Sequence, residues 1–467
     1  MDTKTYDEID SVTKKGLIVI LIAAFLSFGL YLFLPYESNV NKGLSLLLFI
    51  AILWLTEAVH ITITALMIPV IGILIGIGSG SGETFKPSTI KYFLQKFADP
   101  TIFLFFGGFA LATALHIQKL DKKIAMKLIK LSGSNLGYVT FAICGVTALL
   151  SMWISNTATA AMMLPLAIGM LLGLDKQKDK GTIVFVLLGI AYSASIGGLG
   201  TMVGSPPNAI VSAELKYTFW DWMKVGMPMV IILWPLMMMV LYFVFKPNLS
   251  KTINLDNEAE IPWNIKRILT IAVFCVTAFC WIFAKPLTNL TGVVFSDGLI
   301  AILAAILVVV LGLCTWNDIV KNTEWGVLLL FGGGLTLSAI LKDTGASLVI
   351  GQEVANIFAS SSPITIIFIV TIFIIILTEF TSNTASAALL VPVFAGVASQ
   401  IGMPKEVLVI VIGIGASCAF MLPVATPPNA IVFGTGKFEQ KDMVKAGIVL
   451  NIFSTLVIAL FAYFFLL

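Results

Sequence analysis

The chain carries the same polar interruption twice inside long apolar runs. The motif Ser-Asn-Thr-Ala occupies 155–158 and recurs at 382–385. A second motif, Pro-Pro-Asn-Ala-Ile-Val, occupies 206–211 and recurs at 427–432. Similar spacing between the two copies of each motif predicts that the chain is internally duplicated. In a membrane chain, paired interruptions of this kind indicate a transporter with its binding site between the halves.

The composition places the chain in a membrane. Hydrophobic residues make up 58% of the 467 residues and charged residues 11%, whereas soluble domains carry about 25% charged residues. This small number of charged residues cannot cover a surface that faces water. We therefore predict an all-α integral membrane protein. The net charge of +3 gives no basic surface for nucleic acid, and membrane lipid is the expected surrounding partner.

Eleven apolar stretches have a length close to the ~20 residues that a bilayer crossing needs. We expect transmembrane helices near 16–35, 43–58, 60–78, 97–118, 182–203, 224–245, 264–286, 295–314, 325–341, 404–425 and 443–466. Two further apolar regions, about 136–173 and 363–398, are split near the middle by Ser-Asn-Thr. We interpret them as re-entrant hairpins, because broken backbone at membrane depth survives only inside protein or beside a water-filled cavity.

The distribution of Lys and Arg orients the chain. Most of the 28 basic residues fall in segments that share one side with the N-terminus, which the positive-inside rule assigns to the cytoplasm. We therefore predict a multi-pass protein of the cell inner (plasma) membrane with a cytoplasmic N-terminus and an outside C-terminus.

The repeats predict the domain organisation. Phe-Gly-Gly at 106–108 matches 331–333, a third landmark at similar spacing. Each repeat holds five crossings and one hairpin, and an odd number inverts the second copy, so the hairpin tips can meet near the midplane. Within one membrane domain we expect three parts: the cytoplasmic N-terminus and first span (1–43), repeat 1 with an inner hairpin (44–246), and repeat 2 with an outer hairpin (264–467).

The residues at the four interruptions suit ions. Backbone carbonyls and the oxygens of Ser, Thr and Asn are ligands for a cation such as Na+, and N–H groups at a half-helix N-terminus favour an anion. No Lys or Arg lies within any interruption, so a bound anion needs amides, hydroxyls and bound cations to neutralise it. The plainer alternative is that Ser, Asn and Thr only cap the half-helices.

Taken together, these motifs resemble the divalent anion/sodium symporter family, and the match is close to its bacterial INDY-type dicarboxylate transporters. The resemblance runs from about residue 16 to the C-terminus. It implies a homodimer of eleven-helix protomers, each with a scaffold domain and a mobile transport domain. It also implies an elevator-type movement and Na+-coupled uptake of C4-dicarboxylates such as succinate, malate and fumarate.

The resemblance also implies the site residues. One Na+ would be bound by Ser151, Ser155, Asn156 and Gly204, and a second by Thr378, Thr381, Asn383 and Ala425. The substrate carboxylates would contact Ser155, Asn156, Thr157, Ser205, Ser382, Asn383, Thr384, Thr426 and Pro427. Position 381 is Thr where close relatives are expected to carry Ala, which leaves open whether its carbonyl or its hydroxyl serves the ion.

The sequence also fits two other transport functions. A citrate or sulfate transporter of the same family is the nearest alternative, and a channel is a second one. The chain lacks His-Glu-x-x-His, Gly-x-Ser-x-Gly and nucleotide-binding motifs, so we expect no enzyme, no cofactor apart from Na+ as coupling ion, and no transition metal. Glu379 has two readings, a proton-coupling carboxylate or a structural anchor, and we favour the anchor.

Overall fold

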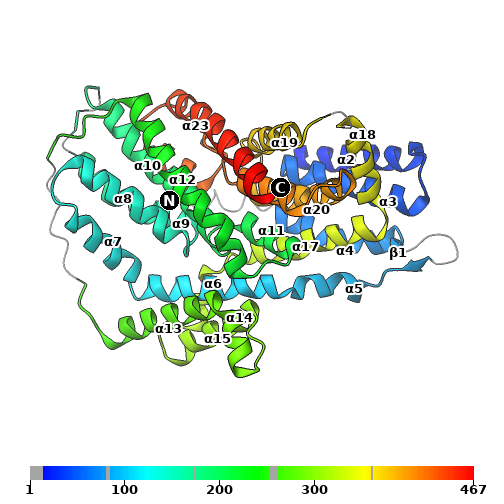
Figure 1. The fold of residues 1–467 in the computed structure, drawn as a ribbon, viewed down its shortest axis with the longest axis horizontal. Coiled ribbons are helices and arrows are strands. Elements are labelled where there is room, and N and C mark those ends of the chain that lie inside the picture. The colour runs from blue at the N-terminus through cyan, green and yellow to red at the C-terminus, as the bar shows by residue number, and fades with distance from the viewer. Residues whose placement is uncertain (1–13, 80–84, 173, 176, 253–260, 359–360) are drawn as a thin grey trace.

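The computed structural model describes residues 14–79, 85–172, 174–175, 177–252, 261–358 and 361–467 (Figure 1). These residues are almost entirely helical, as the composition predicts. Two short antiparallel strands, β1 (Gly78–Ser79) and β2 (Lys86–Pro87), pair with each other. The predicted cytoplasmic N-terminus falls largely on residues 1–13, which lie outside the described residues.

The helices follow one another along the chain with short connections. Up to residue 245 they are α2 (Lys14–Phe33), α3 (Ser38–Thr56), α4 (Ile61–Leu74), α5 (Ile90–Leu94), η2 (Gln95–Ala98), α6 (Pro100–Ile117), α7 (Leu120–Leu131), α8 (Leu136–Ser151), α9 (Asn156–Leu171), α10 (Lys180–Gly197), η3 (Gly198–Gly200), α11 (Pro206–Leu215) and α12 (Phe219–Phe245). From residue 265 they are α13 (Ile265–Ile282), α14 (Ala284–Thr291), α15 (Asp297–Val310), α16 (Trp316–Asn322), α17 (Trp325–Asp343), α18 (Ala346–Ile357), α19 (Pro363–Thr378), α20 (Asn383–Gln400), α21 (Lys405–Ala416), α22 (Pro427–Phe433), α23 (Gln440–Phe461) and η4 (Ala462–Leu466).

Each of the predicted spans overlaps one of these helices, but the span predicted at 404–425 is helical only as far as Ala416, where α21 ends. In the described part of the chain, eight helical segments are long and apolar enough to cross a bilayer. The helices α4 and α15 have 14 residues each and α21 has 12, so the number of crossings stays a prediction. The short helices α7, α14, α16 and α18 were not predicted, because none contains an apolar run of membrane length.

Both Ser-Asn-Thr motifs lie where one helix ends and the next begins. The helices α8 and α9 are separated by residues 152–155, and α19 and α20 by residues 379–382. Ser155 and Ser382 are the N-caps of α9 and α20, and each hydroxyl accepts a hydrogen bond from the backbone N–H three residues later. Ser at an N-cap satisfies one of the four unpaired N–H groups of a helix start, so the motif itself starts the second half-helix.

The Pro-Pro-Asn motifs begin helices rather than lie inside them. The α10 backbone continues as a 3-10 turn to Gly200, and α11 starts at Pro206; α21 ends at Ala416, and α22 starts at Pro427. Pro is tolerated in the first turn of a helix because that turn has no partner for its N–H groups. The residues just before each Pro-Pro pair are therefore non-helical backbone inside the protein.

Packing brings the interruptions of the two sequence halves together. The half-helix α9 packs on α22, and α20 packs on α11, so each hairpin contacts the Pro-Pro-Asn helix of the other half. The helix α10 runs against α8 and α12, while α19 runs against α21 and α23. Figure 1 shows α5 and α6 along one edge with α13, α14 and α15 beside them, and α6 packs on α15.

Candidate functional site

A cavity of about 450 Å³ lies between the two Ser-Asn-Thr tips. Both tips and both Pro-Pro-Asn segments contribute to its wall, together with the end of α3, the middle of α6 and the start of α17. Its lining residues are Glu57, Phe105, Phe109, Ser155, Asn156, Thr157, Val203, Gly204, Ser205, Pro206, Pro207, Glu324, Val327, Phe380, Thr381, Ser382, Asn383, Thr384, Val424, Ala425, Thr426, Pro427 and Pro428.

The cavity brings together nearly all the residues that the resemblance singles out. Every residue expected to contact substrate is in the lining. Of the residues expected to bind Na+, only Ser151 and Thr378 are not in the lining, and both are fully buried behind it. The duplicated motifs, separated by more than two hundred residues in sequence, therefore form one site in space.

Oxygen atoms converge around Asn156 at the first tip. One terminal atom of the Asn156 carboxamide lies 2.6 Å from the Ser151 hydroxyl, 3.1 Å from the Ala194 carbonyl oxygen and 3.2 Å from that of Gly204. The Ser151 hydroxyl also lies 2.7 Å from the Ala194 carbonyl oxygen. With its nitrogen in this place the carboxamide donates to these oxygens; with its oxygen there, the cluster consists of oxygens alone. Such a cluster is a natural cation site.

The second tip repeats this arrangement. The Thr378 hydroxyl lies 2.6 Å from the side-chain oxygen of Asn383 and 2.7 Å from the Ala416 carbonyl oxygen. A hydroxyl has one proton, so it can satisfy only one of these two acceptors at a time. Ser151 and Thr378, Asn156 and Asn383, and Ala194 and Ala416 thus occupy matching places at the two tips.

The Asn of each Pro-Pro-Asn motif holds the non-helical backbone in place. Asn208 donates from its amide nitrogen to the carbonyl oxygens of Gly198 (2.8 Å) and Thr201 (2.7 Å). Asn429 donates in the same way to Ala419 (3.0 Å) and Leu422 (3.1 Å). Both side chains are fully buried. The third residue of each motif is therefore a brace for the backbone and does not line the cavity.

The structure addresses the open question about Thr381. Its hydroxyl donates to the Leu377 carbonyl oxygen at 2.9 Å and lies 2.6 Å from the Ser386 hydroxyl. The hydroxyl is therefore used within its own hairpin. Whether this hydroxyl or the backbone carbonyl serves an ion stays a prediction, since the hydroxyls of Ser151 and Thr378 also donate to backbone carbonyls.

Charge in the cavity wall is entirely acidic. The lining contains no Lys or Arg, and its charged residues are Glu57 and Glu324. Glu324, which precedes α17, lines the cavity together with Ser155. The sequence singles out neither Glu324 nor Glu57, because both lie outside the duplicated motifs. No local signal in the sequence places either carboxylate beside the tips.

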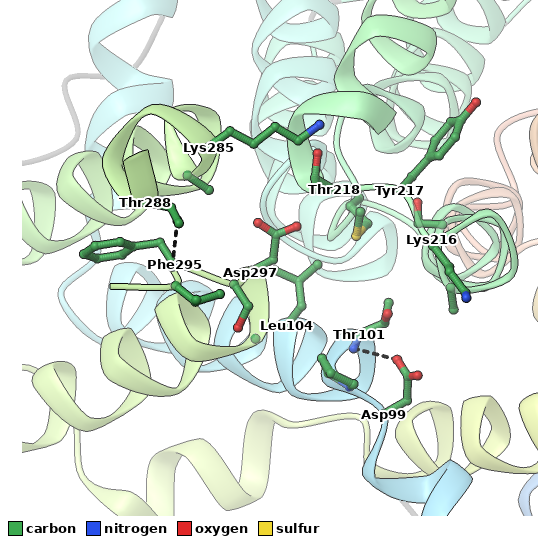
Figure 2. Close-up of a pocket in the computed structure, with 18 of the residues that line it drawn as sticks. Asp99, Thr101, Leu104, Lys216, Tyr217, Thr218, Lys285, Thr288, Phe295 and Asp297 are labelled. Atoms are coloured by element: carbon green, nitrogen blue, oxygen red, sulfur yellow. Dashed lines mark hydrogen bonds between the residues drawn. The ribbon is translucent and has the colours of Figure 1, made fainter. Parts of the chain in front are cut away.

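A second cavity of about 460 Å³ lies apart from the motifs. Figure 2 shows it between the start of α6, the turn at Lys216 and Thr218, and the residues Lys285 to Asp297. Asp297 accepts a hydrogen bond of 2.7 Å from the backbone N–H of Phe219. Lys285 lies 3.5 Å from the Asp221 carboxylate. These groups link α12 to α14 and α15, and none of the motif residues is in the lining.

Comparison with known proteins agrees with the motifs. Residues 15–467 match the model of a family described as the sodium:sulfate symporter transmembrane region. A transporter of Haemophilus influenzae is 54% identical over 461 residues, covering 97% of each chain. The sodium-dependent dicarboxylate transporter SdcS of Staphylococcus saprophyticus is 32% identical over 489 residues, covering 96% of this chain and 91% of its own.

Solved structures support the fold. The Alcanivorax borkumensis YdaH transporter superposes with a TM-score of 0.56 at 13% identity, covering 87% of this chain and 99% of its own. Neisseria gonorrhoeae MtrF superposes with a TM-score of 0.55 at 13% identity, covering 87% and 95%. At this identity the likeness concerns the fold alone.

Proposed function

The chain belongs to the sodium:sulfate symporter family, and we propose that it is a Na+-coupled secondary active symporter that imports C4-dicarboxylates such as succinate, malate and fumarate. The relationship to SdcS, a sodium-dependent dicarboxylate transporter, supports the choice of ion and substrate class.

One observation carries the proposal: the cavity at the duplicated motifs has polar walls but no cationic side chain. Its lining offers hydroxyls, amides and backbone groups, and its charged residues are two glutamates. A dianion placed there meets no positive charge from the protein, and burying an unpaired charge is costly. Bound Na+ supplies that charge, so substrate binding depends on the ion.

The two oxygen clusters are the proposed Na+ sites. At the first, rotation of the Asn156 carboxamide would turn its oxygen toward Ser151 and the carbonyls of Ala194 and Gly204. At the second, Asn383 and Thr378 would act with the carbonyls of Ala416, Thr381 and Ala425. Oxygen ligands of this kind suit hard cations. Each ion would lie next to the cavity and partly neutralise it.

The helix starts are the proposed carboxylate sites. The half-helices α9 and α20 begin at the two tips, and α11 and α22 begin at the Pro-Pro pairs, all of them bordering the cavity. Helix N-termini favour anions because their dipoles are positive there and their first N–H groups are unpaired. The Pro-Pro pairs at the start of α11 and α22 lack these first N–H groups, so these two helices offer the dipole without them. Hydroxyl groups surround these helix starts in the cavity lining, from Thr157, Ser205, Ser382, Thr384 and Thr426. Pro427 would contact the substrate through its apolar ring.

We propose that transport follows an elevator mechanism. The moving unit would comprise the two hairpins with α10, α11, α12, α21, α22 and α23, and it would slide against a scaffold formed by the other spans. Glu57 and Glu324, which belong to the scaffold side, border the cavity in this conformation, and we propose that the cavity opens toward the side where α3 ends and α17 begins. The expected orientation makes that side the cytoplasm. A homodimer in the plasma membrane is part of the same proposal.

Sulfate or citrate transport is the competing proposal. The description of the matching family names sulfate, and a cavity of about 450 Å³ has room for any of these anions. The polar groups of the lining can hydrogen-bond the oxygens of sulfate as well as those of carboxylates.

Uptake into sealed proteoliposomes decides between these substrates. Radiolabelled succinate is presented with an inward Na+ gradient, with K+ in place of Na+, and with excess unlabelled citrate or sulfate. The proposal predicts saturable uptake that requires the Na+ gradient and resists competition by sulfate. Uptake without saturation indicates a channel, and strong inhibition by sulfate or citrate with little succinate uptake supports the competing substrate.

A further inference from the structure

A buried glutamate lies at the second tip, behind the cavity. Glu379 follows Thr378 directly and is fully buried. One carboxylate oxygen accepts hydrogen bonds from the backbone N–H groups of Phe420 (2.7 Å) and Met421 (2.9 Å) and from the side-chain amide of Asn451 (2.7 Å). The other oxygen accepts from Met421 (3.0 Å) and Leu422 (3.1 Å).

Every hydrogen bond recorded for this carboxylate comes from an N–H donor. A protonated carboxylic acid would donate one hydrogen bond and would need an acceptor beside it. Among the described residues, no ion pair joins Glu379 to a Lys, Arg or His. Hydrogen bonds to several N–H groups stabilise the charged form of a carboxylate. The geometry is therefore that of a fixed anion held by the protein.

The first repeat has no such anion, and the register between the repeats can be read from two glycines. A side chain at Gly226 of α12 would collide with the Leu199 carbonyl, and one at Gly447 of α23 would collide with the Phe420 carbonyl. Leu199 and Phe420 are separated by 221 positions in sequence, and Gly226 and Gly447 are separated by the same number. The helices α12 and α23 therefore occupy matching positions against the two breaks.

In this register an apolar pair in the first repeat becomes a polar pair in the second. Glu379 matches Met152, since the tips are offset by 227 residues, and Asn451 matches Val230. The Met152 side chain lies against Gly200, the counterpart of Met421, whose N–H group is bound by Glu379. Both residues differ between the repeats in the same sense, from apolar to polar. This indicates that Glu379 and Asn451 act together as one local interaction.

The backbone differs in the same place. In the first repeat, Gly198–Gly200 form a 3-10 turn, in which backbone carbonyls accept from the N–H groups of the turn. In the second repeat, residues 418–422 form no helix, and the N–H groups of Phe420, Met421 and Leu422 point at Glu379. The carboxylate therefore takes the place of the acceptors that a helical turn supplies in the first repeat.

This backbone leads directly to the second proposed Na+ site. The Leu422 carbonyl oxygen accepts from the Asn429 amide and from the N–H group of Ala425 (3.3 Å). Ala425 is one of the expected ion ligands, and Thr378 is the neighbour of Glu379 in sequence. Moving Phe420, Met421 and Leu422 would therefore move the ligands of the second site.

We propose that Glu379 is a positioning residue for the second Na+ site: it holds the non-helical backbone that presents the ligands, and its fixed charge makes this site bind Na+ more tightly than the first. The inference rests on the proposed function for the identity of the ion. In this proposal the buried carboxylate of Glu379 positions ligands and does not transfer a proton.

The positional half of the proposal is tested by hydrogen–deuterium exchange in Na+-free buffer. Glu379→Gln keeps the size but replaces one acceptor by a donor. We expect faster exchange in peptides covering 418–426 of this variant, and unchanged exchange in peptides covering 197–205. Wild-type protection of 418–426 in a folded Glu379→Gln protein would overturn the positional claim.

The electrostatic half is tested by Na+ titration of purified protein, with thermal stabilisation as the readout. Loss of a group that orients metal ligands weakens binding by about 10- to 100-fold. We expect Glu379→Gln to raise the Na+ half-saturation by that factor, while the succinate half-saturation at saturating Na+ changes much less. Met152→Leu is the matched change at the first tip and should leave the Na+ titration close to wild type.

A second variant covers the case in which Glu379→Gln does not fold. The double substitution Glu379→Met with Asn451→Val rebuilds the apolar pair of the first repeat, where the backbone forms a 3-10 turn at Gly198–Gly200 and needs no carboxylate as acceptor. It should fold and still lose tight Na+ binding; a wild-type Na+ titration in this variant contradicts the proposal. If wild-type protein shows no response to Na+ at all, the proposed function fails, whereas the exchange experiment still decides the positional claim.

Discussion

The hydroxyl of Thr378 lies 2.6 Å from the side-chain oxygen of Asn383 across the tip between α19 and α20. Ser151 and Asn156 are separated by the same 2.6 Å at the other tip. Each hydroxyl is also 2.7 Å from a backbone carbonyl of a neighbouring helix. The two halves of the chain thus place matching clusters of oxygen atoms on either side of one cavity.

The two Asn residues should be essential for Na+-coupled uptake. Removing a hydrogen-bonding partner of a charged group costs about 1.5–3 kcal/mol, which corresponds to roughly tenfold or more in affinity. We expect Asn156→Ala and Asn383→Ala each to abolish Na+-stimulated succinate uptake in proteoliposomes while the protein elutes as wild type in size-exclusion chromatography. Wild-type transport by either purified variant would refute the site.

The Thr381 hydroxyl should matter more for stability than for ion binding. Because it bonds Leu377 and Ser386 within the hairpin, Thr381→Ala removes about 1 kcal/mol of hydrogen bonding and keeps the backbone carbonyl. We expect a lower melting temperature and a Na+ half-saturation within about threefold of wild type, since ligand geometry is preserved. A much larger change in the Na+ titration shows that the hydroxyl itself reaches the ion.

Glu324 should weaken the binding of a dianion in this conformation. Glu324 is in the cavity lining, as is Ser155 of the first tip. Glu324→Gln removes a like charge, so we expect succinate to bind about three- to tenfold more tightly at saturating Na+. The measurement is calorimetric titration of purified protein. Glu406→Gln, an acidic residue of α21 outside the cavity lining, is the control and should match wild type.

Asp179 and Lys251 should stabilise the protein in a pH-dependent way. Both Asp179 oxygens lie within 2.8 Å of the Lys251 ammonium, and the hydrogen bond from Lys251 holds the pKa of Asp179 below its usual value. A carboxyl whose pKa is lowered by folding stabilises the fold above its unfolded pKa and stops doing so as pH falls through the folded one.

Asp179→Asn should therefore lower the melting temperature at pH 7 by roughly 1–3 °C. The difference from wild type should shrink as pH falls below the ordinary value of 3.8. A difference that stays constant from pH 7 to pH 3 indicates that packing, and not the ion pair, is responsible.

Duplication decided how much of this site could be predicted. The Ser-Asn-Thr and Pro-Pro-Asn motifs occur twice, so their shared location could be expected from sequence, and the structure places both pairs on one cavity. Glu324 belongs to neither the Ser-Asn-Thr nor the Pro-Pro-Asn motifs and lies more than fifty residues from each of them in sequence. Its place beside Ser155 depends on how α17 packs, which no local pattern encodes.

The role of Glu379 shows the same limit. Its place inside a membrane hairpin was predicted from the apolar run around it, but a proton-coupling acid and an anchor have the same sequence. The distinction depends on Asn451, 72 residues away, and on three backbone N–H groups. The helices were predicted more easily, because apolar runs of membrane length define them, whereas α7 and α14 lack such runs.

Succinate binding to purified protein, measured calorimetrically in NaCl and in choline chloride of equal ionic strength, tests the central claim most directly. A cavity without cationic side chains should bind the dianion in NaCl and show no measurable binding in choline chloride. Equal affinity in both salts contradicts the account, because the protein alone would then neutralise the substrate.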